Sequence, residues 1–202
     1  GVFYSGSKYR TIWTALRNEN ASLRNPDSLS YLISKNQHFV FNHAKQLNGK
    51  PFLFSSANYQ NKVVIIQIMG TWCPNCLDET KVLKELYNDL HRYGLEIISV
   101  CYEADIELKK QLKKLKDFKK RSKIPYTVLY GGLASKELAS SDFGMLNQVM
   151  SFPTSIFIGK DGNVWSIHTG FNGPATGEAY TNFKNKIRYE IEIKLRFQRM
   201  FT

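Results

Sequence analysis

Two of the three cysteines, Cys73 and Cys76, are separated by two residues and could act as a redox pair. The third, Cys101, stands apart, so the cysteines do not form a disulfide framework. The pair follows an apolar run and precedes Pro74, which suits the first position of a helix. A helix N-terminus favours the thiolate, the form that attacks a disulfide. The spacing therefore predicts thiol–disulfide exchange, with an exposed Cys73 as nucleophile and a shielded Cys76 resolving the mixed disulfide.

Half of a zinc site is the alternative interpretation of a C-x-x-C pair. Such a site would need a second pair of ligands. His38 and His43 have ligand-like spacing, but they precede the cysteines in a region expected to be strand and loop. We therefore expect no metal, and no cofactor beyond a redox-active disulfide between Cys73 and Cys76.

The formal net charge is +11, and nine of the basic side chains lie between residues 109 and 123. Such a balance could favour nucleic acid or an anionic membrane surface. However, apolar residues recur at helical spacing through this stretch, which indicates an amphipathic surface helix with a solvated basic face. No RNA-binding aromatic signature or zinc-finger spacing accompanies it, so no nucleic-acid partner is expected. No apolar run is long enough to span a membrane.

The order of the remaining segments favours an α/β sandwich, in which a central mixed sheet is covered by helices on both faces. Strands are expected over residues 38–41, 52–54, 62–69, 96–102, 126–130, 155–158 and 164–168. Helices are expected over residues 74–93, 109–123 and 135–146, and from 177 toward the C-terminus.

The first 35 residues lack strand alternation, and short helices are expected over residues 8–17 and 29–33, the second capped near Asp27. We interpret residues 1–35 as a helical extension that packs onto a main domain of residues 36–202. The chain begins with Gly1 rather than Met, so a processed or trimmed product is expected.

The run from Met69 to Cys76, with Glu79 three residues further on, resembles the thioredoxin-like TlpA/ResA group of extracytoplasmic disulfide reductases. Over residues 36–195 the chain is most similar to TlpA-like proteins at the C-terminal end of longer exported chains in Bacteroidetes-type bacteria. In those, a segment similar to residues 24–29 precedes the thioredoxin part. The resemblance implies a thioredoxin-like three-layer sandwich, a missing upstream domain, and a location in the periplasm or at the cell surface.

The resemblance also implies a substrate-binding set. Its cis-proline matches Pro153, which would shape a groove where a substrate strand pairs with the backbone of Phe152. The alternative for Pro153 is a plain turn proline at the start of a strand. Trp72 would line the substrate surface, and Pro74 and Asn75 lie between the two cysteines.

Three polar residues complete the implied site. Gln67 occupies the position where thioredoxins proper carry a buried acid, and the TlpA/ResA group is also neutral there. Glu103, at the end of the next strand, would take or give the proton of Cys76, its pKa raised by partial burial. A solvated loop carboxylate is the alternative for Glu103. Glu79 would either favour the helix dipole or take part in the redox chemistry, and Cys101 is expected in the core.

The function implied by the resemblance is reduction of disulfides in exported proteins. Its partners would be protein disulfide substrates, apocytochrome c being one in the family, and a membrane-bound thiol electron donor. A disulfide oxidant or isomerase would use the same residues, because direction depends on reduction potential. A peptide-binding module is a further alternative. A peroxiredoxin-like peroxidase would need threonine and proline where Gly70 and Gln67 stand.

Overall fold

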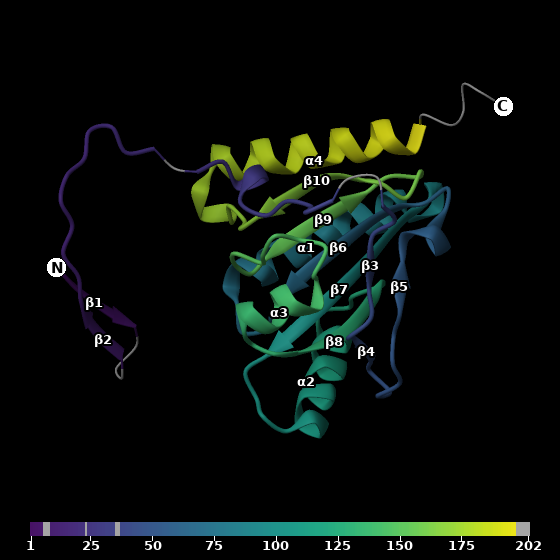
Figure 1. The fold of residues 1–202 in the computed structure, drawn as a ribbon, viewed down its shortest axis with the longest axis horizontal. Helices are drawn as coiled ribbons and strands as arrows, with labels where there is room; N and C mark the ends of the chain where they lie inside the picture. The colour runs from purple at the N-terminus through teal and green to yellow at the C-terminus, as the bar shows by residue number, and fades with distance from the viewer. Residues whose placement is uncertain (6–8, 23, 35–36, 197–202) are drawn as a thin grey trace.

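The computed structural model describes residues 1–5, 9–22, 24–34 and 37–196. Its centre is a mixed six-stranded sheet with the strand order β10-β9-β6-β7-β8-β4 (Figure 1). The strands β6, β7 and β8 are parallel, while β9, β10 and β4 each run antiparallel to their neighbours. The strands of this sheet are β4 (Lys45–Gln46), β6 (Val63–Met69), β7 (Leu95–Glu103), β8 (Thr127–Leu133), β9 (Thr154–Ile158) and β10 (Val164–Thr169).

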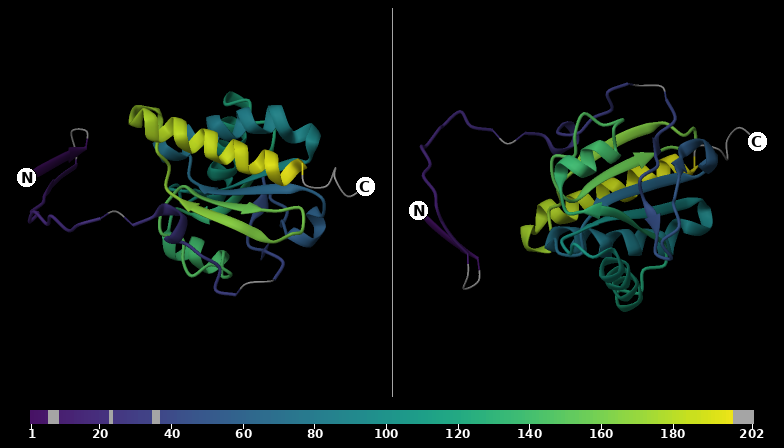
Figure 2. Two further views of the ribbon diagram at one scale, coloured as in Figure 1. Left: turned by 90° about the horizontal axis from the view of Figure 1, so that it is seen from above. Right: turned by 60° about the horizontal axis from the view of Figure 1, so that its bottom comes forward.

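Helices cover both faces of this sheet, as Figure 2 shows for α4 and α3 on opposite sides. Apolar side chains of α1, α2 and α4 join one core cluster, and those around α3 join a second. The helices are α1 (Pro74–Leu90), α2 (Leu108–Arg121), α3 (Lys136–Asp142) and α4 (Glu178–Arg196). This arrangement confirms the predicted α/β, thioredoxin-like three-layer sandwich. No helix among the described residues is long and apolar enough to cross a membrane.

The segment that carries the cysteines agrees well with the secondary structure predicted from the sequence. Every residue of β6 is buried, because the strand lies between two neighbours and under helices on both faces. Pro74 stands at the first turn of α1, and Gly94 ends the helical segment with a φ of 108°. The predicted strand over residues 62–69 and helix over residues 74–93 are therefore confirmed.

Two of the predicted strands lie outside the main sheet and are shorter than expected. β3 (Val40–Phe41) pairs with β5 (Phe54–Ser55) as a separate two-stranded ribbon. Phe41 stacks on Phe54 with ring centroids 5.1 Å apart and also contacts Phe143 beyond α3. This aromatic layer and α3 together cover the second face of the sheet.

The predicted N-terminal helix over residues 8–17 is wrong. β1 (Val2–Ser5) and β2 (Tyr9–Ile12) instead form an antiparallel hairpin, which lies away from the sheet in Figure 1. The segment is rich in β-branched and aromatic residues, which favour strands once a partner strand is adjacent. Residues 6–8, which include the start of the predicted helix, lie outside the described part.

The predicted helix over residues 29–33 is also wrong. A single 3-10 turn covers Pro26–Ser28, and Asn25 rather than Asp27 caps it, accepting a hydrogen bond from the amide of Asp27. Beyond the turn, Ile33 and Tyr31 exchange backbone hydrogen bonds with the loop 145–147. These backbone bonds take the groups that a helix would need.

The N-terminal segment is fastened to the sheet through Asp27. Its carboxylate lies 2.6 Å from Nδ1 of His168 in β10 and 2.7 Å from Nζ of Lys186 in α4. The segment around Asp27 therefore packs on the main domain, whereas the β1–β2 hairpin of the predicted extension lies away from it (Figure 1). The proposed domain boundary at residues 35–36 and the last six residues of the predicted domain, 197–202, lie outside the described part.

Candidate active site

Cys73 and Cys76 form a disulfide at the start of α1, with Cα atoms 5.3 Å apart. Cys73 is the N-cap residue, and its Sγ accepts a hydrogen bond of 3.3 Å from the amide of Cys76. The first amides of a helix have no partner within the helix, so they are free to stabilise a negative sulfur. The local structure therefore gives Cys73 the environment of a reactive thiolate.

The two sulfurs differ in access to solvent. Cys73 is 7% exposed and Cys76 is fully buried. Cys73 is thus more enclosed than the sequence suggested, because it lies against the loop that precedes β9. The prediction of an exposed Cys73 is therefore wrong, although Cys73 remains the less buried of the two residues.

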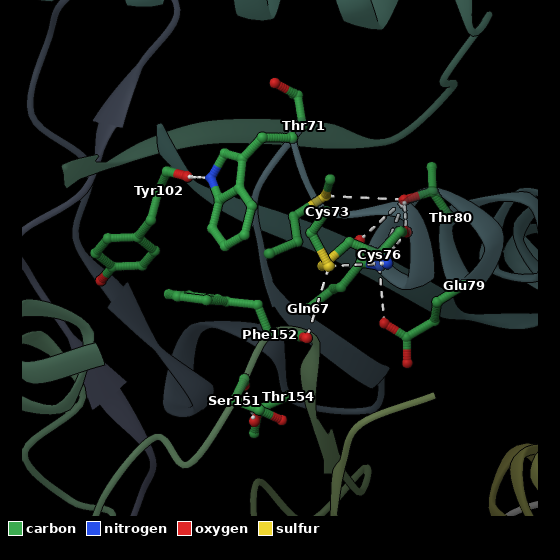
Figure 3. Close-up of a disulfide and its surroundings, with 12 residues drawn as sticks. Gln67, Thr71, Cys73, Cys76, Glu79, Thr80, Tyr102, Ser151, Phe152 and Thr154 are labelled. Carbon is green, nitrogen blue, oxygen red and sulfur yellow. Dashed lines mark hydrogen bonds between the residues drawn. A yellow bond between two sulfur atoms is a disulfide. The ribbon is translucent and has the colours of Figure 1, made fainter. Parts of the chain in front are cut away.

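The peptide bond between Phe152 and Pro153 is cis, as the resemblance implied. The carbonyl oxygen of Phe152 lies 3.6 Å from Sγ of Cys73, and Figure 3 shows it pointing at the disulfide. The ring of Phe152 packs between those of Trp72 and Tyr102, with centroids 5.7 and 5.8 Å away. Trp72 is 45% exposed, so it forms an open aromatic rim beside Cys73.

The loop that leads into the cysteines is tied to the end of β7. Nε1 of Trp72 donates a 2.9 Å hydrogen bond to the carbonyl oxygen of Tyr102. The amide and the hydroxyl of Thr71 donate to the two carboxylate oxygens of Glu103 over 2.8 and 2.7 Å. A side chain at Gly70 would meet the carbonyl oxygen of Tyr102 at 2.8 Å, so this close approach requires glycine.

Glu103 is fully buried, so the interpretation as a solvated loop carboxylate is wrong. Nζ of Lys114, from α2, lies 2.8 Å from its Oε2. Its hydrogen bonds go to Thr71, and none joins it to a cysteine. Nothing in the sequence singled out Lys114, which was predicted only as one lysine of a basic helix.

Glu79 is the second buried acid, one turn into α1. Its Oε2 accepts a hydrogen bond of 2.8 Å from Nε2 of Gln67, and its Oε1 accepts one of 2.9 Å from Oγ of Ser155. Burial raises the pKa of Glu79 to about 7, although these two hydrogen bonds act to lower it. Glu79 is 2% exposed, so whichever of the two predicted roles it has, it has in the interior of the protein.

Gln67 is the centre of a buried polar network beneath the cysteines, visible in part in Figure 3. Its Nε2 also donates a hydrogen bond of 3.3 Å to the carbonyl oxygen of Cys76, and its Oε1 accepts one of 2.7 Å from the hydroxyl of Ser99. Ser99 and Ser155 were missed by sequence reasoning. The available signal was a serine in each of two otherwise apolar buried strands.

The other cysteine and histidines form no second centre. Burial, and then the charge of Glu103, raise the pKa of Cys101 well above its usual value, which fits a core residue. His38 lies 3.4 Å from the hydroxyl of Ser56, and His43 lies 3.9 Å from Asp142. Among the described residues, no group of histidine, cysteine and acidic side chains is arranged to hold a metal ion.

A mixed sheet that presents a C-x-x-C disulfide at a helix N-terminus, opposite a cis-proline, defines a thioredoxin-like protein with a redox-active centre. The residues of this centre lie within the part of the chain that matches a protein-family model. The chain belongs to the AhpC/TSA family, whose model matches residues 16–167.

Curated relatives confirm the predicted resemblance to the TlpA/ResA group. The thiol-disulfide oxidoreductase ResA of Bacillus thuringiensis subsp. konkukian is 32% identical over 108 residues, which cover 53% of this chain and 54% of ResA. The thioredoxin-like protein YneN of Bacillus subtilis is 24% identical over 126 residues, covering 62% of this chain and 66% of YneN. The chain thus spans about half the length of the ResA relative.

Solved structures share the fold at low identity. A thiol:disulfide interchange protein of Chlorobium tepidum superposes with a TM-score of 0.57 at 24% identity, covering 80% of this chain and 97% of the other. A putative protein disulfide isomerase from Bacteroides thetaiotaomicron gives a TM-score of 0.55 at 14% identity, with coverages of 80% and 92%.

Proposed function

We propose that this protein is a thiol–disulfide oxidoreductase that reduces disulfides in exported proteins. The observation that carries the proposal is the difference between the two cysteines: Cys73 caps the helix and is 7% exposed, while Cys76 lies within the first turn and is fully buried. This asymmetry gives one sulfur for attack and one for resolution.

The reduced enzyme begins with the thiolate of Cys73 attacking one sulfur of the substrate disulfide. The substrate S–S bond breaks, a mixed disulfide forms, and one substrate thiolate leaves. Cys76 then loses its proton and attacks Sγ of Cys73, which forms the enzyme disulfide and releases the second substrate thiolate. The substrate gains two electrons and the dithiol loses two.

Glu79 is the residue that we assign to the proton of Cys76. A carboxyl with a pKa of about 7 exists in both forms near neutral pH, so it can accept and return a proton. Gln67 contacts both Glu79 and the carbonyl oxygen of Cys76, which keeps the acid beside the first turn of the helix. Glu103, the residue first considered for this role, is instead engaged by Thr71 and Lys114.

The substrate would lie along the loop before β9. An extended peptide could pair with the backbone of Phe152, whose carbonyl oxygen already faces Cys73. Trp72 would cover the peptide from the other side, since its ring is open to solvent and packs against Phe152. Pro153, with Pro74 and Asn75 between the cysteines, would complete this surface.

The reductase direction, the membrane-bound thiol donor and the extracytoplasmic location all follow from the resemblance to the TlpA/ResA group. The name of the ResA relatives supports thiol–disulfide exchange but specifies no direction. An oxidant or isomerase would use the same geometry, and the reduction potential of the pair distinguishes them.

A peroxidase is less well supported. The position three residues before Cys73 is Gly70, which has no hydroxyl to offer a peroxide. The adjacent hydroxyl, on Thr71, donates to Glu103 instead. Gln67 stands where a proline would be needed.

Turnover of a disulfide-bonded protein such as insulin, with dithiothreitol as reductant, tests the proposal. Cys73→Ser should abolish turnover, and Cys76→Ser should trap a mixed disulfide with substrate that mass spectrometry detects. Cys101→Ser is the matched control and should keep wild-type turnover. A Cys73→Ser variant that still reduces insulin would rule out the proposed nucleophile. Peptide binding by this variant is expected both for an oxidoreductase and for a peptide-binding module, so turnover is the measurement that decides.

A further inference from the structure

The ion pair between Glu103 and Lys114 joins the basic helix α2 to the loop that carries the nucleophile. Glu103 is fully buried, and both of its oxygens accept hydrogen bonds from Thr71. Nζ of Lys114 lies 2.8 Å from Oε2, and its side chain reaches inward from a position that is 41% exposed. Lys114 is the cation that the described residues provide for this buried charge.

The charge of Glu103 acts on its surroundings. Burial first, and then this charge, raise the pKa of Cys101 on the same strand. On β8, the pKa of Tyr130 is raised by burial and by Glu103, against a hydrogen bond from Gln111. A carboxylate that influences these neighbours would also oppose a second negative charge at Cys73, two residues beyond Thr71.

We propose that Lys114 is a positioning residue for Cys73, and that it acts by neutralising Glu103. This inference rests on the proposed function, in which Cys73 attacks as a thiolate. The neutralised carboxylate holds the backbone and hydroxyl of Thr71 and so fixes the approach to α1. Removing Lys114 would leave an uncompensated buried charge, which is costly and disfavours a thiolate nearby.

The pairing also changes the role of Glu103. A carboxylate that accepts two hydrogen bonds and an ammonium contact holds the loop in place, and none of these contacts is with a cysteine. Glu79 is left as the acid that exchanges protons, while Glu103 and Lys114 set the charge under the loop. Each buried acid thus has its own role: Glu79 exchanges a proton, and Glu103 holds the loop.

The test is the rate at which iodoacetamide alkylates Cys73 of the reduced full chain between pH 5 and 9, with mass spectrometry identifying the modified cysteine. Lys114→Met should slow alkylation at pH 7 by about threefold or more, equivalent to about half a pH unit in the profile. Lys114→Arg keeps the charge and should match wild type. Lys113→Met, at an exposed lysine on the same helix, is the matched control and should also match wild type.

Two further variants separate charge from mere packing. Glu103→Gln leaves Lys114 without its carboxylate and should alkylate at least as fast as wild type. The double variant Glu103→Gln/Lys114→Met carries no buried charge and should return to within about twofold of wild type. If Lys114→Met does not fold, Glu103→Gln and the double variant decide the matter.

A Lys114→Met rate equal to wild type, a double variant as slow as Lys114→Met, or a Glu103→Gln rate below wild type would overturn the inference. Failure of the proposed function would look different, because wild-type Cys73 would then alkylate no faster than an ordinary cysteine in a peptide.

Discussion

Gln67 donates a 2.8 Å hydrogen bond to Glu79 in the buried space behind the disulfide. Gln67 stands on β6 where thioredoxins proper carry a buried acid, and here the acid is supplied instead by the helix that follows. The amide holds the carboxylate in place without adding a second charge. This division lets one buried acid titrate near neutral pH beside Cys76.

Glu79→Gln should slow turnover at neutral pH by about 10- to 100-fold, because the proton of Cys76 loses its acceptor. The carboxylate is the accepting form, so wild-type activity should rise as pH increases through about 7, and the variant should lose this inflection. The measurement is kcat for insulin reduction between pH 5 and 9. Glu85→Gln, at an exposed position of the same helix paired with Lys184, is the control. A variant with the wild-type profile would exclude Glu79 from proton transfer.

The same substitution should stabilise the folded protein at alkaline pH. The pKa of Glu79 is raised from 4.5 to about 7 by folding, so the folded state binds more protons than the unfolded state between these values. Stability from this residue is therefore present below pH 4.5 and is lost as pH rises through 7, by an order of about 3 kcal/mol. Urea unfolding of the oxidised protein should show Glu79→Gln more stable than wild type at pH 8 and equal to it at pH 4. The opposite order at pH 8 would contradict the assignment.

Asp27→Asn should weaken the attachment of the N-terminal segment. Burial alone would raise the pKa of Asp27, but hydrogen bonds and charges from Lys186 and His168 lower it below 3.8. The stabilising effect is thus present above pH 3.8 and is lost as pH falls through the lower, folded value. We expect a loss of about 1 kcal/mol at pH 7 and less at pH 3, measured by urea unfolding.

Glu19→Gln provides the comparison for Asp27, because Glu19 forms an exposed ion pair with Arg17. Such pairs contribute little, so its free energy of unfolding should match wild type. Equal effects of the two substitutions would show that the contacts of Asp27 with β10 and α4 do not stabilise the fold.

Trp72→Ala should impair peptide substrates more than small ones. The ring covers the approach to Cys73 and packs against Phe152, so its loss removes contact area for an extended peptide. We expect kcat/KM for insulin to fall about tenfold, within the range for a buried aromatic contact at an interface. Reaction of the oxidised enzyme with dithiothreitol should stay near wild type. Trp72→Phe keeps a smaller aromatic ring and removes the indole N–H that donates to Tyr102, so it tests how much of the effect comes from this hydrogen bond. Equal losses in the reactions with insulin and with dithiothreitol would argue against a substrate-binding role.

Local patterns were sufficient for the core of the fold. The apolar run of β6, Pro74 at the start of α1 and Gly94 at its end each act through neighbouring backbone, so the sequence predicted them correctly. The cysteine pair was predictable for the same reason, since its chemistry depends on adjacent positions. The motif before the strand β9 pointed to Pro153.

Long-range contacts were not predictable from these patterns. Asp27 contacts His168 across 141 residues of sequence, and Lys114 contacts Glu103 only because α2 folds back against the sheet, next to β8. The burial of Glu79 was not predictable either, because nothing near it in sequence shows that Gln67 of β6 and Ser155 of β9 contact it. The N-terminal hairpin was missed because a strand needs a partner that periodicity alone does not identify.

The central claim is most directly tested by the reduction potential of the Cys73–Cys76 couple, obtained by equilibrating the protein with dithiothreitol or glutathione and counting thiols by alkylation and mass. We predict a reversible two-electron couple near that of thioredoxin, about −270 mV. A value near that of DsbA, about −120 mV, would contradict the reductase direction. The absence of any reversible couple would contradict the proposed thiol–disulfide exchange itself.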